Sequence, residues 1–164
     1  MTVDFTRDLV IERYKFIQEK QKHLDSILSS NVSLLVKVFI GLFSLVFAVL
    51  GTYLKQPEVI SLSLVTLVFK LSLILLLVVS VIIFLMTISN VIAWLGYRRD
   101  EVELLQKFGG DFQREEPKLS NMFAWQETWF LFALIVIIIT AASLLLRSSQ
   151  FIDFFFEVLQ QQPQ

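Results

Sequence analysis

Cysteine is absent from this chain of 164 residues, and histidine occurs once, as His23. Without cysteine the chain has no disulfide, no thiolate metal ligand and no cysteine nucleophile. One histidine is too few for a histidine-based metal site or a catalytic triad within one chain. Glycine and proline are also scarce, with five and three residues, and the glycine-rich loop that cradles phosphates is missing. We therefore predict no metal, no cofactor and no enzymatic activity.

Charge is balanced overall and absent from long stretches. The net charge of −1 gives no reason to expect nucleic-acid binding, whereas 55% of the residues are hydrophobic, more than in ordinary soluble domains of this size. The longest uncharged stretch, Leu71 to Tyr97, is bracketed by Lys70 and Arg98. About 20 apolar residues of helix cross the hydrocarbon core of a bilayer, which is about 30 Å thick. This stretch therefore predicts a membrane span.

Two further apolar stretches complete an all-α membrane protein. We predict three transmembrane helices at about 33–54, 71–97 and 128–146, within a membrane domain of residues 31–147. Residues 59–70 fit either an outward extension of the second span or a segment along the membrane interface. Residues 98–127 form a cytosolic loop, whose first part continues the helix of the second span as far as Gly109-Gly110, a favourable C-terminal cap.

Residues 1–30 predict an amphipathic helix without the short apolar core and cleavage site of a signal peptide. Val3, Val10, Ile17 and Leu24 repeat every seven residues and so share one face of a helix. This seam fits packing on the other helices of the chain, and it also fits self-association as a coiled coil.

Lysine and arginine set the predicted orientation, because they concentrate in cytoplasmic segments. They are frequent in residues 1–30 and 98–127 and sparse on the other side, where Lys55 and Arg147 lie. We therefore place the amino terminus in the cytoplasm and the chain in the cell (inner) membrane as a multi-pass protein. Three spans then leave residues 148–164 outside, as an amphipathic tail rich in phenylalanine that suits a membrane interface.

One face of the first span carries small residues in steps of three, four or multiples of four. Such residues let two helix backbones approach closely in lipid. The small-residue stripe is a helix-packing seam, within one chain or between copies, and it consists of Ser33, Gly41, Ser44, Ala48 and Gly51. Lys37 lies on the same stripe, about one turn inside the span. We expect its ammonium group to reach the nearby surface, and a charge facing a pore is the alternative.

The second span carries a polar stripe. Thr66, Ser80, Thr87 and Trp94 share a seven-residue register, and Asn90 lies one turn from Thr87. Polar side chains in lipid hydrogen-bond to neighbouring helices, and around an axis shared by several copies they would line a passage. The residues predicted to be pore-lining, or polar and interhelical, are Lys37, Ser80, Thr87 and Asn90.

These features predict a homo-oligomeric inner-membrane protein that forms a pore or perturbs the bilayer. In layout, a charged amino-terminal helix with a few spans and a short cytosolic hairpin resembles the small bacterial membrane effectors of antiviral defence systems. The alternative is a non-conducting membrane anchor or sensor that recruits a cytosolic protein through residues 1–30 and the inner loop. The predicted partners are thus the lipid bilayer, further copies of the chain and, under the alternative, a cytosolic protein.

Overall fold

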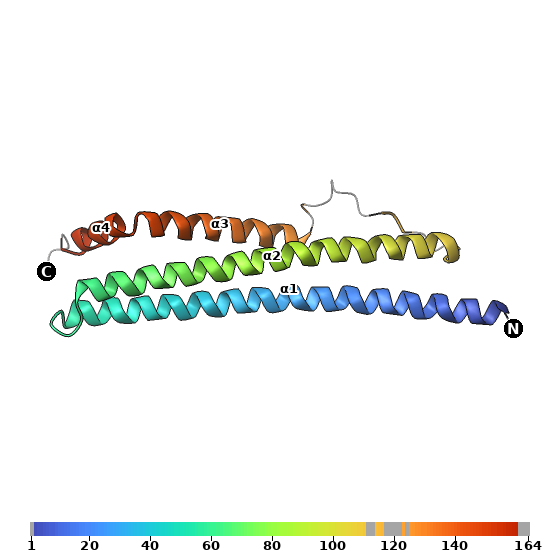
Figure 1. Ribbon diagram of the computed structural model, residues 1–164, viewed down its shortest axis with the longest axis horizontal. Coiled ribbons are helices and arrows are strands. Elements are labelled where there is room, and N and C mark those ends of the chain that lie inside the picture. The colour runs from blue at the N-terminus through green and yellow to red at the C-terminus, as the bar shows by residue number, and fades with distance from the viewer. Residues whose placement is uncertain (1, 111–113, 117–122, 124, 161–164) are drawn as a thin grey trace. The chain divides into compact units, whose positions relative to one another are not determined.

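The computed structural model describes residues 2–110, 114–116, 123 and 125–160, whose regular secondary structure is helical throughout. Its helices are α1 (Thr2–Lys55), α2 (Leu62–Phe108), α3 (Gln126–Leu146) and α4 (Ser148–Gln160) (Figure 1). Of these, α1, α2 and α3 are long and apolar enough to cross a membrane. The all-helical class and the three helices suited to spanning are therefore confirmed.

Helix α1 carries both the predicted amino-terminal helix and the predicted first span without a break. No proline occurs before Pro57, and the first glycine is Gly41, so the first forty residues contain neither of the strongest helix breakers. The helix ends at Lys55, two residues before Pro57, whose ring cannot continue a helix.

Helix α2 begins at a serine cap. The Ser61 hydroxyl accepts a hydrogen bond from the backbone N–H of Leu64 at 3.3 Å, and the Ser61 carbonyl also accepts from Leu64 and Val65. Serine is a preferred residue at this position because its oxygen satisfies an N–H group that the helix leaves free. Residues 62–70 therefore belong to α2, which agrees with the prediction that residues 59–70 extend the second span. Residues 59–61 precede the helix.

The other end of α2 lies at the glycine pair. The helix ends at Phe108, and Gly110 has a φ of +56°. Glycine adopts this left-handed conformation without the strain that a Cβ atom would add, so the predicted stop at Gly109-Gly110 is confirmed. Arg147 is a turn residue between α3 and α4. Residues 161–164 of the predicted tail lie outside the described residues.

The chain divides into two compact units. Unit one comprises Met1–Val32 and Leu85–Leu131, and unit two comprises Ser33–Phe84 and Phe132–Gln164. In unit one the first part of α1 lies antiparallel to the last part of α2 (Figure 1). The rings of Phe16 and Tyr97 meet edge to face with centroids 6.4 Å apart, and Ile17 is fully buried. Of the seven-residue seam, Ile17 is thus buried within the chain, Val10 and Leu24 are half-buried, and the side chain of Val3 lies outside what the structure describes.

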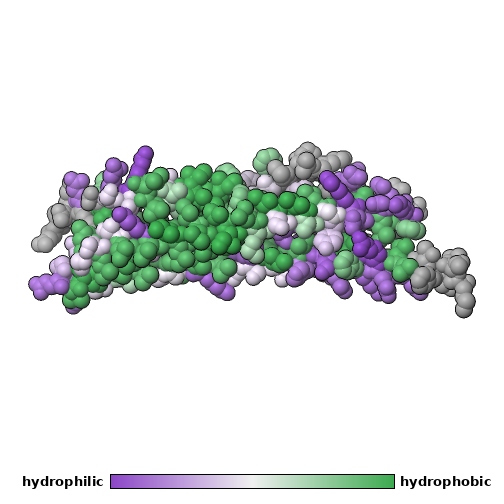
Figure 2. Space-filling model, viewed as in Figure 1, coloured by the Kyte–Doolittle hydropathy of each residue, from purple (hydrophilic) through white to green (hydrophobic). Residues whose placement is uncertain are grey.

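Unit two joins the second part of α1 and the first part of α2 to α4 and to α3 from Phe132 onward. Leu73, Leu134 and Ala141 are buried, and the rings of Phe69 and Phe151 stack with centroids 5.6 Å apart. Hydrophobic side chains cover most of the visible face of unit two, whereas hydrophilic side chains are frequent on unit one (Figure 2). Unit two therefore has the surface expected of a part that lies in lipid.

Candidate functional site

A buried carboxylate forms the most highly connected polar site in unit one. Glu101 lies one turn beyond Tyr97 on α2, and its side chain has no exposed surface. A carboxylate is rarely buried in full unless positive charges or hydrogen-bond donors compensate for the lost water. The surroundings of Glu101 therefore determine what it does.

Four side chains donate to Glu101. Its Oε1 atom accepts from Gln18 and Arg114, both at 3.0 Å, and its Oε2 atom accepts from Gln21 at 3.2 Å and from Arg98 at 2.6 Å. The glutamines belong to α1, Arg98 to α2 and Arg114 to the segment that follows α2. A carboxylate has about four lone-pair positions, so these donors occupy all of them. Glu101 therefore fastens three segments together and has no free position at which to act as a base.

The electrostatics of the site agree with this role. Burial raises the pKa of Glu101, but the hydrogen bond from Gln21 and the charges of Arg98 and Arg114 together lower it by more. The net pKa lies below the usual value, so the carboxylate is ionised at neutral pH and holds its donors as a charge.

Sequence reasoning missed Glu101, although the signal was present. The polar stripe of α2 repeats every seven residues through Ser80, Thr87 and Trp94, and Glu101 is the next position in that register. Residues seven apart lie on the same side of a helix, so the register predicts that Glu101 faces α1.

The polar residues predicted in the second span are buried within the chain. Ser80 and Thr87 have no exposed surface, and Asn90 is nearly buried. The Asn90 Nδ2 atom donates to the backbone carbonyl of Leu24 on α1 at 2.9 Å, which is an interhelical hydrogen bond. Ser80 Oγ has no partner among the described residues, and neither has the buried Asn31 Nδ2, which sequence reasoning did not single out.

The small-residue stripe, in contrast, faces away from the chain. Ser33, Gly41, Ser44 and Ala48 are exposed and Gly51 is half-buried. A Cβ atom added at Gly41 or Gly51 would meet nothing within 4 Å. The stripe thus has room on its outer side for a close neighbour.

The reason for this exposure lies in the helical period. Two positions along a helix correspond to a rotation of about 200°. Ser44 follows Leu42, and Ala48 follows Val46, by two positions, and both of the earlier residues are half-buried. The small-residue stripe therefore lies on the side of α1 opposite to the side that packs within unit two.

Lys37 lies exposed on the same outward side, two positions after the buried Leu35. Among the described residues its ammonium group has no ion pair or hydrogen bond, and no three His, Asp or Glu side chains lie together as a metal site would require. The structure thus separates the four predicted pore-lining or interhelical residues, with Lys37 facing outward and Ser80, Thr87 and Asn90 facing inward.

No known protein family matches this chain, and comparisons with curated proteins and with solved structures also found no match.

Proposed function

We propose that the chain is a multi-pass protein of the cell membrane that works as a homo-oligomer, whose copies meet through the small-residue stripe of α1. The observation that carries this proposal is the exposure of Ser33, Gly41, Ser44 and Ala48 within a helix apolar enough to span a bilayer. Lipid tails are as apolar as leucine, so helices associate in a bilayer by close backbone packing, for which small residues are needed. Among the described residues, nothing lies within 4 Å of a Cβ atom added at Gly41 or Gly51.

The position of Lys37 on the small-residue stripe supports a more specific function for this assembly, the formation of a pore. A lysine inside a span needs water or a short route to the surface. On a face shared by several copies it meets its own equivalents, whose like charges keep the helices apart at that level and favour a hydrated axis. A ring of lysines in such an axis would select anions. We therefore propose a pore-forming or membrane-perturbing assembly, with Lys37 as the residue that faces the passage.

The test of self-association is the variant Gly41→Leu. Because nothing lies within 4 Å of a Cβ atom at this position, the substitution leaves the single chain intact but blocks close approach of a second copy. We expect the dissociation constant of the oligomer, measured in nanodiscs or by energy transfer in liposomes, to rise about tenfold or more.

Gly96→Leu is the matched control. Gly96 is also an exposed glycine in a predicted span with nothing within 4 Å of an added Cβ atom, but it is not part of the small-residue stripe. The control should assemble like the unmodified chain. If both variants assemble normally, or if the unmodified chain is a monomer at every lipid dilution, the proposal is wrong.

Conduction is tested separately in liposomes. The unmodified chain should release chloride, and Lys37→Glu should reduce anion flux and favour cations, because the charge that faces the passage is reversed. An oligomer that releases no ions, with or without a membrane potential, would contradict the proposed pore but not the proposed oligomer.

The second candidate function, a non-conducting anchor for a cytosolic protein, is favoured by a different observation. Leu9 and Ile11 lie outside the predicted spans, yet they are 50% and 42% exposed, and Tyr14 and Phe16 beside them are also exposed. Ile11 and Tyr14 lie three positions apart and so share one side of α1, and exposed apolar side chains on one surface outside the membrane are typical of a protein contact. The double variant Ile11→Ser and Tyr14→Ser should abolish capture of such a partner and leave oligomer size unchanged, whereas loss of the oligomer alone would favour the first proposal.

A further inference from the structure

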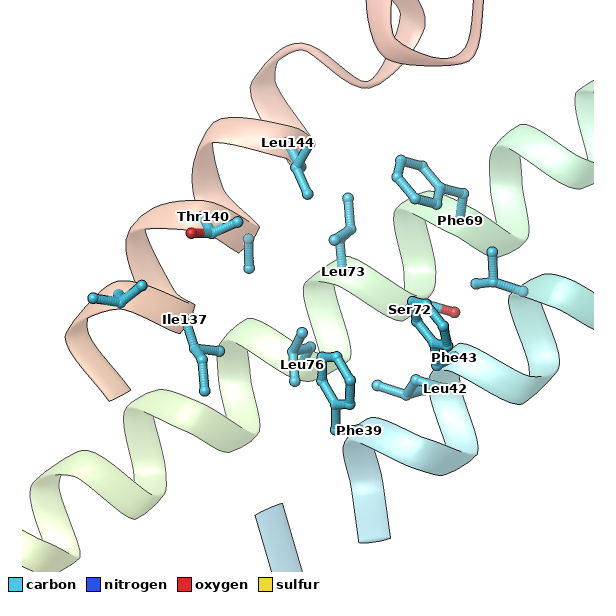
Figure 3. A pocket seen from close by; sticks show the side chains of 13 residues that line it. Phe39, Leu42, Phe43, Phe69, Ser72, Leu73, Leu76, Ile137, Thr140 and Leu144 are labelled. Carbon is cyan, nitrogen blue, oxygen red and sulfur yellow. The ribbon is translucent and has the colours of Figure 1, made fainter. Parts of the chain in front are cut away.

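A groove in unit two combines an apolar cavity with a cationic end. The cavity has a volume of about 350 Å³ and lies between α1, α2 and α3, whose side chains converge on it, among them Phe39, Phe69 and Leu144 (Figure 3). Its lining is apolar except for Ser72 and Thr140. The space therefore suits a hydrocarbon ligand and not water, which needs polar partners.

The cavity is open at the side. Phe39, Phe43 and Val136 line it, and each is about half exposed, at 46%, 55% and 47%. An apolar cavity that stays empty gives up the dispersion contacts of its lining. In a bilayer the molecules that meet this opening are lipids, whose acyl chains can enter from the side.

A second cavity adjoins the first, because Thr140 and Leu144 line both. It differs in chemistry, since Ser143, Arg147 and Gln150 contribute polar groups to its lining. Among the described residues the Arg147 guanidinium has no ion pair and no hydrogen-bond acceptor. Guanidinium groups bind phosphates through two parallel hydrogen bonds, so this end of the groove suits an anionic head group.

The length of the groove fits one lipid. Val136 lines its apolar end and Arg147 its polar end, and at 1.5 Å per residue these positions are about 16 Å apart along α3. Half of a bilayer's hydrocarbon core measures about 15 Å. An acyl chain whose phosphate lies at Arg147 would thus reach the apolar end at about the middle of the membrane.

We propose that unit two binds one anionic phospholipid, with an acyl chain in the apolar cavity and its phosphate on Arg147. The site is separate from the small-residue stripe, because α1 turns Phe39 and Phe43 toward the cavity and the small residues to the opposite side. Assembly through the stripe therefore leaves the lipid site open, and the two proposals are tested by different variants.

The experiment is native mass spectrometry of the full chain, released from detergent after incubation with phosphatidylglycerol or with phosphatidylcholine. We expect one phosphatidylglycerol per chain to be retained, and Arg147→Gln to reduce the retained fraction about tenfold, as the loss of one charge-assisted contact predicts. Lys55→Gln is the matched control, since Lys55 is an exposed cation that lines neither cavity. It should retain the lipid in full.

A second variant tests the acyl-chain cavity and keeps the head-group region unchanged. Thr140→Phe places a ring where the two cavities adjoin and should reduce retention of both lipids, whereas Ile135→Phe, at an exposed position of α3 outside the lining, should have no effect. Gly41→Leu should also retain the lipid, even where it breaks the oligomer.

Three results would overturn the lipid proposal. The first is the absence of retained lipid in the unmodified chain, and the second is equal loss in Arg147→Gln and Lys55→Gln. The third is a change in copy number with Thr140→Phe without a change in lipid retention, which would assign the groove to a second copy of the chain.

Discussion

Units one and two connect different stretches of the same two helices by different chemistry. In unit one α1 and α2 are joined by the hydrogen bonds that Gln18 and Gln21 donate to Glu101 and by the hydrogen bond from Asn90 to Leu24. An ion pair between Arg13 and Asp100, 2.8 Å long, joins them as well. In unit two the core is made of aliphatic residues such as Leu73 and Leu134 and of the stacked rings of Phe69 and Phe151.

This difference indicates where each unit obtains its specificity. In unit one the buried polar contacts decide which residues of α1 and α2 meet, because a buried polar group requires its partner. In unit two the core is apolar, and side chains such as Phe39 and Phe43 border an open cavity. Unit one therefore fixes the register of its helices by specific hydrogen bonds, whereas unit two leaves the cavity and the small-residue stripe exposed.

The largest effect that separates the units is expected from Glu101→Ala. Removing the carboxylate leaves Arg98 and two glutamines without their acceptor, and breaking a buried ion pair typically costs about 3–5 kcal/mol. The free energy of unfolding, measured by denaturant titration of the full chain in micelles, should fall by that order. Hydrogen exchange should accelerate in α2 between residues 85 and 108.

Glu103→Ala is the matched control for this prediction. Glu103 lies two residues away and pairs with Lys107, but both side chains are about two-thirds exposed. Exposed ion pairs contribute little, so the unfolding curve should not move. Equal loss in the two variants would show that burial of Glu101 has no special importance.

A smaller effect is expected from Asn90→Leu. The variant removes the donor to the Leu24 carbonyl, which then keeps only its hydrogen bond within α1, so the free energy of unfolding should fall by about 1 kcal/mol. Ser89→Leu, at the exposed neighbouring position, should cause no such loss. Unchanged stability of Asn90→Leu would mean that the hydrogen bond is dispensable.

For Ser80 we expect the change in stability to have the opposite sign. Its buried hydroxyl has no partner among the described residues, so Ser80→Ala removes a cost and should leave stability unchanged or raise it by about 1 kcal/mol. The midpoint of thermal unfolding in micelles measures this effect. A clear loss would reveal a hydrogen-bond partner such as a bound water.

The smallest effect on stability is expected from a change of pH between 8 and 5. Because the folded-state pKa of Glu101 is lowered, its contribution to stability is present above the unfolded pKa of about 4.3 and is lost as the pH falls through the lower folded-state value. The stability of unit one should therefore be flat in this window and decline below it. In the variant Glu101→Gln this position no longer titrates, so the decline in stability below pH 5 should be smaller by the share that Glu101 contributes.

Most of the fold could be predicted from the sequence, because apolar stretches and helix-ending residues are local signals. Pro57 and the Gly109-Gly110 pair indicated the ends of α1 and α2, and Arg147 indicated the end of α3. The start of α2 was less clear, since Val59 and Ile60 are as apolar as the helix that follows. Only the hydrogen bond on Ser61 places the boundary.

The candidate sites were predicted in part. The period of the small residues identified one face of α1, but a period does not indicate what lies against that face. Whether Gly41 packs within the chain depends on where α2 and α3 lie, which is tertiary information. Glu101 was missed for a related reason, because its partners Gln18 and Gln21 lie 83 and 80 positions away in the sequence.

The saturated carboxylate has a mechanical consequence for the hairpin of α1 and α2. Sliding one helix past the other by a single residue would carry Glu101 away from both glutamines at once, while Arg98, on the same helix as Glu101, would stay paired with it. We therefore expect α1 and α2 to keep one register in unit one, because a shifted register leaves a buried carboxylate with half of its donors. A conformational change that passes through unit one would have to break both glutamine hydrogen bonds together or keep both.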